Sequence, residues 1–485
     1  MIEPVNADFK KSKVLYNFFF SSLSTFLNMV VPLLTYPYIA RILGPANMGK
    51  LGVAASLTNY FIVAASLGLP VYGMREIART RSDRKTMGNT ASELFIISLF
   101  SSAISTIVYT IIIYVVPQYR NDFGLFIIFG ATIITSTLFI EWFFQGIEQF
   151  RYIGLRNVFI KAAFVICLFL MVKKENDYKI YALLFVGSSF IAMVVNVLSA
   201  TRYVRFSFKR LNLFRHVEPM IVFAILSFLI TAYTNLDFLF LGLFSDNVQA
   251  GFYYISIRLA RMIITFIATL STVLMPKLAA SADTRPEEFR SILRWSADLI
   301  VLFALPAGAG LFAVSGDLAV VFAGKAFAAS ASSLRITAFL VPVVALSNFL
   351  QMQILIPQKK EKKMLISFFT GLFVTGAAMA LLVPRTGQIG AAWGMLAGEL
   401  SVLIVHTLLC NRSDARTIFD RKTFLQYFAG AILCAAFAYG PVFFMNGGAV
   451  RLLVSIVAGS SAYFVYLVML KNEQLLSLLR YIRKK

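Results

Sequence analysis

The chain has 485 residues and a formal net charge of +22, and 59% of its residues are hydrophobic. Its mean hydropathy is +0.77, only 14% of its residues are charged, and Phe alone occurs 47 times. A water-soluble domain could not cover so much apolar surface, so the composition excludes a soluble globular protein and predicts an integral membrane protein.

Apolar runs long enough to cross a bilayer follow one another along the whole chain. A hydrocarbon core of about 30 Å requires about 20 residues of helix, and about fourteen runs of that length occur. They lie at residues 14–40, 50–70, 91–116, 123–146, 153–172, 179–201, 219–244, 250–275, 295–314, 331–356, 364–383, 388–410, 424–444 and 450–470. The sequence therefore predicts an all-α integral membrane protein with about fourteen transmembrane helices.

The connections between these runs are too short to hold a catalytic domain. Most Lys and Arg residues, Arg151 and Arg156 among them, fall in alternate connections on the side of the N-terminus, which predicts two cytoplasmic termini. The expected segments are a cytoplasmic N-terminus (1–13), an N-lobe of helices 1–6 (14–201), a cytoplasmic linker (202–218), a C-lobe of helices 7–12 (219–410), a cytoplasmic loop (411–423), helices 13–14 (424–470) and a cytoplasmic tail (471–485). Positive charge spread over all these connections suits anionic lipid headgroups and argues against nucleic-acid binding.

The first predicted helix carries a polar stripe that includes Asn28 and Pro32. A polar stripe on an otherwise apolar helix is expected to face a cavity, and Arg41 at the end of this helix is assigned to the same cavity. Prolines remove a backbone hydrogen bond, so they mark either hinges or static bends. The candidate hinge residues are Pro32, Pro37, Pro306 and Pro342.

Ionisable residues inside membrane helices are costly and usually line an aqueous path or pair with each other. Glu141 lies toward the cytoplasmic end of helix 4, Lys161 lies about two turns into helix 5, and Asp237 lies near the periplasmic end of helix 7. For these three residues, extension to the membrane interface is the alternative interpretation. Asp298 and Arg335, at the starts of helices 9 and 10, are more simply explained as interface anchors.

Arg258 and Arg261 lie about one turn apart on helix 8, on a face that also holds Thr265. Two permanently charged guanidinium groups on such a face suit a pyrophosphate that has lost its hydration. The alternative is a structural ion pair with Asp237 or Glu399. Both interpretations stay open at this point.

Glu399 lies near the middle of helix 12, with His406 about two turns below it. A carboxylate there fits either proton coupling or an ion pair with a buried arginine. Gly390, Gly394 and Gly398 recur on the same helix at a spacing that is typical of close helix packing.

Catalytic and metal-binding patterns are missing from the sequence. It has no glycine-rich phosphate loop ending in Lys-Ser or Lys-Thr, and His216 and His406 have no metal-ligand spacing. Cys167, Cys410 and Cys434 are isolated in apolar runs, which predicts neither a disulfide framework nor a metal site. We therefore expect no catalytic residue, no metal and no cofactor, with an integral-membrane glycosyl or polysaccharide transferase as a less favoured alternative.

Two hinge segments repeat along the chain. Residues 41–51 after helix 1 correspond to residues 243–253 after helix 7, and residues 74–78 correspond to residues 275–279, with nearly the same offset of about 200 residues. In the first pair, a polar turn leads to Gly49 or Gly251 and then to an apolar helix. This pattern predicts two parallel six-helix lobes around a central site.

Several blocks of sequence carry a family signature. The most specific is YPYIARILG at 36–44 with MG at 48–49, LGLP at 67–70 and GMREIA at 73–78. Further blocks are EWFFQG at 141–146, GQIGAA at 387–392, and Asn348 with Gln351 and Pro357. With these blocks the chain resembles the Wzx-type O-antigen or polysaccharide flippases of the multidrug/oligosaccharidyl-lipid/polysaccharide (MATE-like) exporter superfamily.

The resemblance implies a flippase that moves undecaprenyl-pyrophosphate-linked oligosaccharide repeat units across the bacterial inner membrane by alternating access of two lobes. The residues assigned to the pyrophosphate and sugar cavity are then Arg258, Arg261, Arg41, Lys161, Asn28 and Arg335. Those assigned to ion coupling or charge pairing are Glu399, Asp237, Glu141 and Asp298.

The expected partners are the lipid-linked oligosaccharide, membrane lipids, and a proton or sodium ion for coupling. A polysaccharide polymerase and a chain-length regulator are candidate protein partners, and the chain itself is expected to be a monomer. The alternative function is a drug or metabolite cation antiporter of the same superfamily. That class relies on buried acids, whereas this chain is richer in intramembrane cations.

Overall fold

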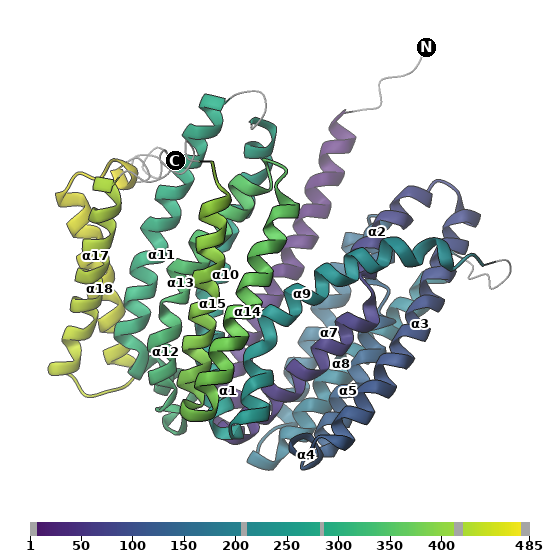
Figure 1. Ribbon diagram of the computed structural model, residues 1–485, viewed down its shortest axis with the longest axis horizontal. Helices are drawn as coiled ribbons and strands as arrows, with labels where there is room; N and C mark the ends of the chain where they lie inside the picture. Colours follow the sequence, from purple (N-terminus) through teal and green to yellow (C-terminus); the bar gives the residue numbers. More distant parts are fainter. Residues whose placement is uncertain (1–6, 205–210, 282–285, 412–420, 477–485) are drawn as a thin grey trace. The chain divides into compact units, whose positions relative to one another are not determined.

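Every regular element in the described part of the chain is a helix. The computed structural model describes residues 7–204, 211–281, 286–411 and 421–476, which form a succession of long helices (Figure 1). Parts of the predicted termini, linker and loop lie outside the described residues, at 1–6, 205–210, 412–420 and 477–485. The all-α prediction is confirmed for the residues described.

Within the described ranges, 13 helices are long and apolar enough to cross a membrane. The first, Phe26–Thr80, has 55 residues and overlaps both of the first two predicted spans, since one crossing needs only about 20 residues. The other twelve are Arg84–Val115, Phe123–Gly146, Phe150–Met171, Glu175–Ala200, Phe214–Phe244, Asn247–Thr269, Glu287–Ala323, Ser330–Leu355, Lys362–Thr386, Gln388–Leu409, Lys422–Phe443 and Ala449–Met469. Each of them overlaps one predicted span.

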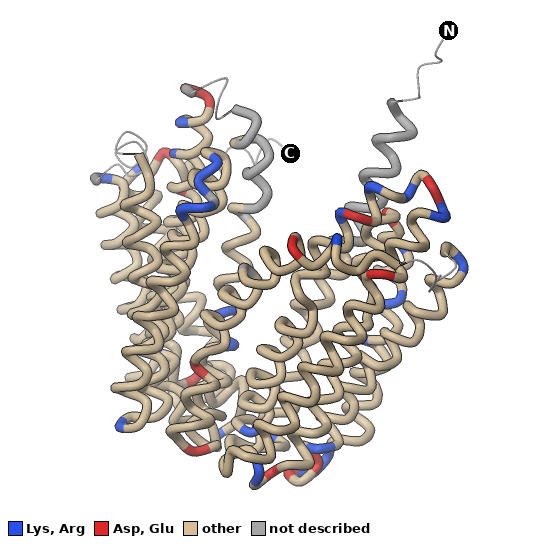
Figure 2. Tube along the Cα trace, turned by 45° about the vertical axis from the view of Figure 1, so that its right-hand side comes forward, with Lys and Arg blue, Asp and Glu red and all other residues tan. Residues whose placement is uncertain are grey.

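Two compact units make up the chain. The first consists of Met1–Leu43 and Lys50–Leu239, and the second of Gly44–Gly49 and Phe240–Lys485. In each unit, charged residues gather toward the ends of the helices and are sparse along their middles (Figure 2). This distribution is what helices in a hydrocarbon core require.

The first unit contains nine α-helices and one short 3-10 helix within its described residues. They are α1 (Ala7–Ser66), α2 (Leu69–Thr80), α3 (Arg84–Val115), α4 (Pro117–Arg120), α5 (Phe123–Thr137), α6 (Glu141–Gly146), α7 (Phe150–Met171), η1 (Glu175–Asp177), α8 (Tyr178–Ala200) and most of α9 (Phe214–Phe244). An aromatic core that includes Tyr72, Trp142, Phe143 and Phe144 joins α2 to α6. Burial of such large rings supplies much of the packing free energy of this unit.

α1 breaks at Gly44, where φ is 71° and ψ is 173°. A positive φ is strained for any residue with a Cβ atom, so glycine is the residue that allows this break. α1 keeps its helical assignment through Pro32 and Pro37, and the break falls after both of them. The hinge roles of these prolines, and of Pro306 and Pro342, stay predictions.

The start of α3 is defined by an N-cap. The side chain of Asp83 accepts hydrogen bonds from the backbone N–H groups of Lys85 and Thr86, which satisfies donors that the first turn leaves free. The hydroxyl of Thr86 also donates to this carboxylate, and these bonds lower the pKa of Asp83 below its usual value. The cap therefore holds the carboxylate in its charged form.

A break in the predicted helix at 123–146 gives Glu141 its place. α5 ends at Thr137, and α6 begins at Glu141 after Ile140, whose φ is 40°. An acidic side chain in the first turn of a helix is stabilised by the partial positive charge of that terminus. Glu141 therefore lies inside the unit at a favourable position for an anion.

The unit division falls inside α9, after Leu239, whereas the predicted lobe boundary is the linker at 202–218. The first part of α9 is bonded to α1, because the Ser56 hydroxyl donates to the Asn235 carbonyl over 2.9 Å. Gly68 lies so close to α9 that a Cβ atom there would be 2.3 Å from the Cβ of Phe223. These contacts explain why most of α9 belongs with the first unit.

The second unit contains the remaining helices. They are the end of α9, α10 (Asn247–Ser281), α11 (Pro286–Ala323), η2 (Lys325–Phe327), α12 (Ser330–Ala338), α13 (Leu340–Leu350), the π-helix η3 (Gln351–Leu355), α14 (Glu361–Thr386), α15 (Gln388–Leu409), α17 (Arg421–Tyr439), η4 (Gly440–Phe443) and α18 (Ala449–Met469). The last pair packs on α11, where the Tyr463 hydroxyl donates to the Leu302 carbonyl over 2.9 Å. Figure 1 shows α17 and α18 side by side with α11.

The glycines of α15 allow close packing against α14. A Cβ atom at Gly390 would lie 2.5 Å from the backbone of Leu382, and one at Gly398 would lie 1.8 Å from the Thr375 hydroxyl. Small residues at such a spacing let two helix backbones approach closely. The packing interpretation of the glycine series is confirmed.

The two repeated hinge segments meet in the second unit. A Cβ atom at Gly49 would lie 1.8 Å from the Asn247 carbonyl oxygen, and one at Gly251 would lie 1.8 Å from the Pro45 carbonyl oxygen. Gly49 corresponds to Gly251 in the repeat, and Pro45 corresponds to Asn247. The contact is therefore reciprocal, and each half of it depends on a glycine that has no side chain.

Candidate functional site

Arg156 is the centre of a buried polar cluster in the first unit. Its side chain, on α7, is only 3% exposed and forms a salt bridge to Glu141 at the start of α6. The guanidinium also donates to the side-chain oxygen of Asn196 on α8, which accepts a second hydrogen bond from the Tyr152 hydroxyl over 3.1 Å. The ring of Phe139 lies 4.7 Å from the guanidinium carbon. We call Arg156, Glu141 and Asn196 the Arg156 cluster.

The position of Arg156 corrects the sequence analysis, which counted it among the cytoplasmic loop cations. It lies within the predicted helix at 153–172, and that overlap was the signal that should have marked it as an intramembrane residue. Its charge is compensated by Glu141 and by Asn196. A buried ion pair with further hydrogen bonds is the arrangement in which such charges are tolerated in a membrane.

A second polar site lies on another face of α7, next to α1. Lys161 donates a hydrogen bond to the side-chain oxygen of Asn28, and both residues line a cavity of about 260 Å³. Five residues further along a helix correspond to a rotation of about 140°, so Lys161 and Arg156 point in different directions. The other lining residues are Val31, Pro32, Thr35, Tyr36, Ile160, Phe164, Tyr181, Phe185 and Ser188.

Three residues for which the sequence predicts a role line the Lys161 cavity. Lys161 and Asn28 were assigned to the substrate cavity and Pro32 to a hinge, and all three line this space. Among the described lining residues, Lys161 alone is a Lys, Arg, Asp or Glu. An ammonium group with hydroxyl and amide groups around it is suited to an anionic oxygen ligand, since all of these groups donate hydrogen bonds.

The arginines of α10 and α12 lie in the second unit. Arg258 is partly buried and its guanidinium carbon lies 5.1 Å from the centre of the Tyr254 ring, and Arg261 is also partly buried. Arg335 is exposed on α12, where its Nε donates to the Ser315 hydroxyl over 3.2 Å. Their assignment to a substrate cavity stays a prediction.

The acidic candidates and Arg41 occupy different surroundings. Glu399 on α15 is buried, and Asp237 on α9 is fully buried and accepts the N–H of Phe238 over 2.8 Å. Asp298 on α11 lines a polar cavity of about 720 Å³ with neighbours that include Arg290, Arg294 and Lys422. Arg41 is exposed on α1. Their coupling and binding roles stay predictions.

Sequence reasoning also missed a cluster around the buried His216 and Glu93, with the exposed Arg215 at its edge. The two ring nitrogens of His216 on α9 lie 2.7 Å from the Tyr72 hydroxyl and 2.9 Å from the Glu93 carboxylate. Arg215 forms a salt bridge to Glu93, and the backbone N–H of Asn212 donates to it over 2.8 Å. We call Tyr72, Glu93, Arg215 and His216 the His216 cluster. Because its members are far apart in the sequence, no local spacing could have predicted it.

Metal coordination has no candidate site among the residues described. Within those ranges, no group of three or more His, Cys, Asp or Glu side chains lies close enough to hold a metal ion. His406 is instead bonded by two hydroxyls, with Ser347 at 3.0 Å and Ser367 at 2.9 Å from its two ring nitrogens. Both ring nitrogens of His406 are therefore engaged in hydrogen bonds within the protein.

The polysaccharide biosynthesis protein family matches residues 14–281, which is more than half of the chain. The chain belongs to this family. The family suggested by the sequence blocks is thereby confirmed. The curated "Putative O-antigen transporter" of Shigella dysenteriae is 24% identical to the chain over 392 residues, which cover 79% of this chain and 94% of that protein.

Solved structures show the same fold at low sequence identity. A lipid II flippase, MurJ, in an inward closed conformation gives a TM-score of 0.74 at 15% identity and covers 94% of this chain and 99% of that one. An inward-facing multidrug-resistance MATE family transporter gives a TM-score of 0.62 at 14% identity and covers 80% of this chain and 95% of that one. The family member described here is therefore a multi-pass membrane protein with the fold of these transporters.

Proposed function

We propose that this protein is a flippase that moves lipid-linked oligosaccharide repeat units across the bacterial inner membrane. The family is concerned with polysaccharide biosynthesis, a relative is named as an O-antigen transporter, and a structural neighbour is a lipid II flippase. The chain has membrane-length helices along its whole described length. In this proposal the cargo is carried on undecaprenyl pyrophosphate. The two lobes open the substrate cavity alternately to one side of the membrane and to the other.

The observation that carries the proposal is the Lys161 cavity. It lies between membrane-length helices, and its charged group is an ammonium next to the amide of Asn28. A pyrophosphate that leaves water needs cationic and hydroxyl donors to replace its hydration, and this cavity offers both. In the proposed mechanism Arg258, Arg261, Arg41 and Arg335 supply further contacts to pyrophosphate and sugar.

Ion coupling is the second part of the proposal. Glu399 is the favoured coupling group because it is a buried carboxyl in the middle of a membrane-length helix. Asp237, Glu141 and Asp298 have charge-pairing roles in this scheme, and the Arg156–Glu141 salt bridge is an example of one. A proton or a sodium ion is the proposed coupling ion.

The positive charge of the Lys161 side chain in the cavity lining argues against a cation antiporter. The MATE-type neighbour shares the fold, but a fold alone does not identify a substrate. A positively charged drug would meet the ammonium of Lys161 and be repelled. A cavity with an acidic lining would have favoured the antiporter.

Transport of a lipid-linked oligosaccharide by the reconstituted protein tests the proposal. Proteoliposomes would contain the purified chain and a polyprenyl-pyrophosphate oligosaccharide whose sugar carries a fluorophore, and a membrane-impermeant quencher would report its movement between leaflets. The Lys161→Met variant should slow this movement about tenfold or more, because a charge-assisted contact worth about 1.5–3 kcal/mol is lost. Lys161→Arg should retain most of the rate.

The matched control is Lys173→Met, which removes an exposed lysine just beyond the end of α7. It should transport at the wild-type rate. If the wild-type protein fails to move the oligosaccharide but exports a cationic dye, the flippase proposal is wrong. If Lys161→Met transports as fast as Lys173→Met, Lys161 is not a contact for the cargo.

A further inference from the structure

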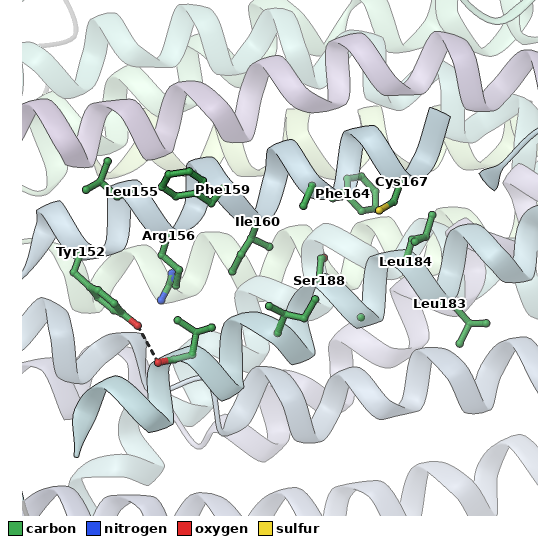
Figure 3. A pocket seen from close by; sticks show the side chains of 14 residues that line it. Tyr152, Leu155, Arg156, Phe159, Ile160, Phe164, Cys167, Leu183, Leu184 and Ser188 are labelled. Atoms are coloured by element: carbon green, nitrogen blue, oxygen red, sulfur yellow. Dashed lines mark hydrogen bonds between the residues drawn. The ribbon is translucent and has the colours of Figure 1, made fainter. Parts of the chain in front are cut away.

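An apolar groove runs between α7 and α8. It has a volume of about 630 Å³, and Figure 3 shows its lining side chains along the two helices, with Tyr152 and Arg156 toward one end and Cys167 and Leu183 toward the other. The remaining lining residues are mostly apolar: Leu155, Phe159, Ile160, Ala163, Phe164, Leu184, Gly187, Ser188, Ile191 and Val195. The groove is therefore suited to an apolar ligand.

The groove is open because α8 has a glycine where a side chain would fill it. A Cβ atom at Gly187 would meet nothing within 4 Å, whereas most other helical glycines in this unit face a neighbour closely. The flanking side chains are exposed, with Phe159 at 72%, Leu183 at 55% and Ile191 at 54%. On a membrane-length helix pair, such a surface is accessible to the chains of lipids.

The groove and the Lys161 cavity share a wall. Ile160 and Phe164 on α7 and Ser188 on α8 line both spaces. The groove side of this wall is apolar, and the other side holds the ammonium of Lys161. A ligand with an apolar chain and an anionic headgroup would match the two spaces at once.

Arg156 does not provide the anionic site, although it lines the groove. Its guanidinium is already bonded to Glu141 and to Asn196, so its charge is compensated. Lys161 instead donates its hydrogen bond to a neutral side chain, that of Asn28. The charged part of a ligand is therefore expected at Lys161 and its apolar part in the groove.

We propose that the α7–α8 groove binds the isoprenoid chain of a lipid-linked substrate while the diphosphate lies at Lys161, beside the residues that line both spaces. This inference rests on the proposed function and adds a specific chain-binding site to it. The occupant is an isoprenoid diphosphate, because a zwitterionic phospholipid would bring its own cation close to the ammonium. Ile160, Phe164 and Ser188, which line both spaces, then lie next to the junction of the chain and its headgroup.

Photolabelling with an isoprenoid probe tests the site. The probe is a polyprenyl diphosphate with a diazirine on its chain, added to the purified full-length protein in phosphatidylcholine nanodiscs, and labelled peptides are identified by mass spectrometry. The wild-type protein should be labelled on α7 and α8, and an excess of unlabelled polyprenyl diphosphate should abolish this labelling.

Gly187 offers a matched pair of variants. Gly187→Phe should lower labelling of α7 and α8 at least about fivefold by filling the groove, whereas Gly187→Ala should be labelled like the wild type, because its methyl group meets open space. Ile191→Trp, another groove residue on an exposed position, gives a second way to fill the space if Gly187→Phe does not fold. Equal labelling of the wild type and a folded groove-filling variant would overturn the proposal.

Lys161→Met separates the headgroup from the chain. It should lower labelling by the diphosphate probe several-fold and leave labelling by an uncharged polyprenol probe unchanged. If a diazirine phosphatidylcholine labels the groove and polyprenyl diphosphate does not displace it, the groove is an ordinary lipid-facing surface and the proposal fails.

The transport assay distinguishes failure of this inference from failure of the proposed function. A wild-type protein that moves the oligosaccharide, together with a folded Gly187→Phe variant that moves it equally fast, would refute the groove and leave the flippase proposal standing. A wild-type protein that moves no lipid-linked oligosaccharide would refute the flippase proposal, and the inference that depends on it, whatever the labelling.

Discussion

Two charged clusters of the first unit can be compared with one neutral polar network of the second unit, which elsewhere has an ion pair of its own, Arg451–Asp317. In the first unit, the Arg156 cluster and the His216 cluster both contain an ion pair, Arg156–Glu141 and Arg215–Glu93. In the second unit, a buried network joins the neutral side chains of Ser256, Ser333 and Gln388, which come from α10, α12 and α15. In both places polar side chains connect helices, with an ion pair in each cluster and without charge in the network.

Single substitutions should cost more in the charged clusters than in the neutral network. Removal of one partner from a buried ion pair leaves an uncompensated charge, at about 3–5 kcal/mol. Removal of one neutral hydrogen bond costs about 1 kcal/mol. The charged clusters should therefore make the first unit more sensitive to substitution than the neutral network makes the second.

The largest effect is expected for Arg156→Met. This change leaves Glu141 without its salt-bridge partner and Asn196 without one of its two donors, so the protein should lose about 3 kcal/mol of stability. The measurement is denaturation in detergent, with hydrogen exchange of α6 and α7 peptides to locate the loss. Arg151→Met, an exposed arginine on the same helix, is the control and should be close to neutral. An unchanged Arg156→Met protein would show that the salt bridge does not stabilise this unit.

A smaller loss is expected for Glu93→Gln. The carboxylate accepts hydrogen bonds from Arg215 and from the Asn212 backbone and contacts His216, and the amide keeps only part of this bonding, which should cost about 2 kcal/mol. The same denaturation experiment measures it. Glu148→Gln weakens the exposed Arg81–Glu148 pair and should cost less than about 1 kcal/mol. Equal losses of stability in the two variants would show that the burial of Glu93 does not increase the cost of its substitution.

The smallest effect is expected for Ser333→Ala in the neutral network. The Gln388 side-chain oxygen loses a donor at 2.8 Å, but Ser256 keeps the Ser330 carbonyl, so the cost should be about 1 kcal/mol. Ser332→Ala, at the preceding position and with only a local hydrogen bond to Ala329, is the control. A loss as large as that of Arg156→Met would remove the distinction between the charged clusters and the neutral network.

Helix positions and family were predictable because they depend on local composition. Twenty apolar residues in a row identify a membrane-length helix wherever it packs, and the blocks around 36–44 and 73–78 are contiguous. The interruption between Thr137 and Glu141 was not predictable in this way. It is a local change of backbone direction inside an apolar run, and hydropathy does not report backbone dihedrals.

The residues of the candidate site could be identified from the sequence, but the contacts between them could not. Lys161 and Asn28 were each identified as polar groups in apolar helices, yet their hydrogen bond joins positions 133 residues apart. Arg156 was missed because its position near the start of α7 made it resemble a loop cation. Only the packing of α6, α7 and α8 shows that its partners are Glu141 and Asn196.

The reciprocal contact of Gly49 and Gly251 has a consequence for the origin of the chain. In an isologous interface between identical subunits, residue i of one contacts residue j of the other, and j contacts i in return. Gly49 faces Asn247 while Gly251 faces Pro45, and these positions are equivalent in the two halves. The contact between these two segments of the second unit thus has the reciprocal form of an isologous contact, as expected if both segments derive from one duplicated ancestral segment.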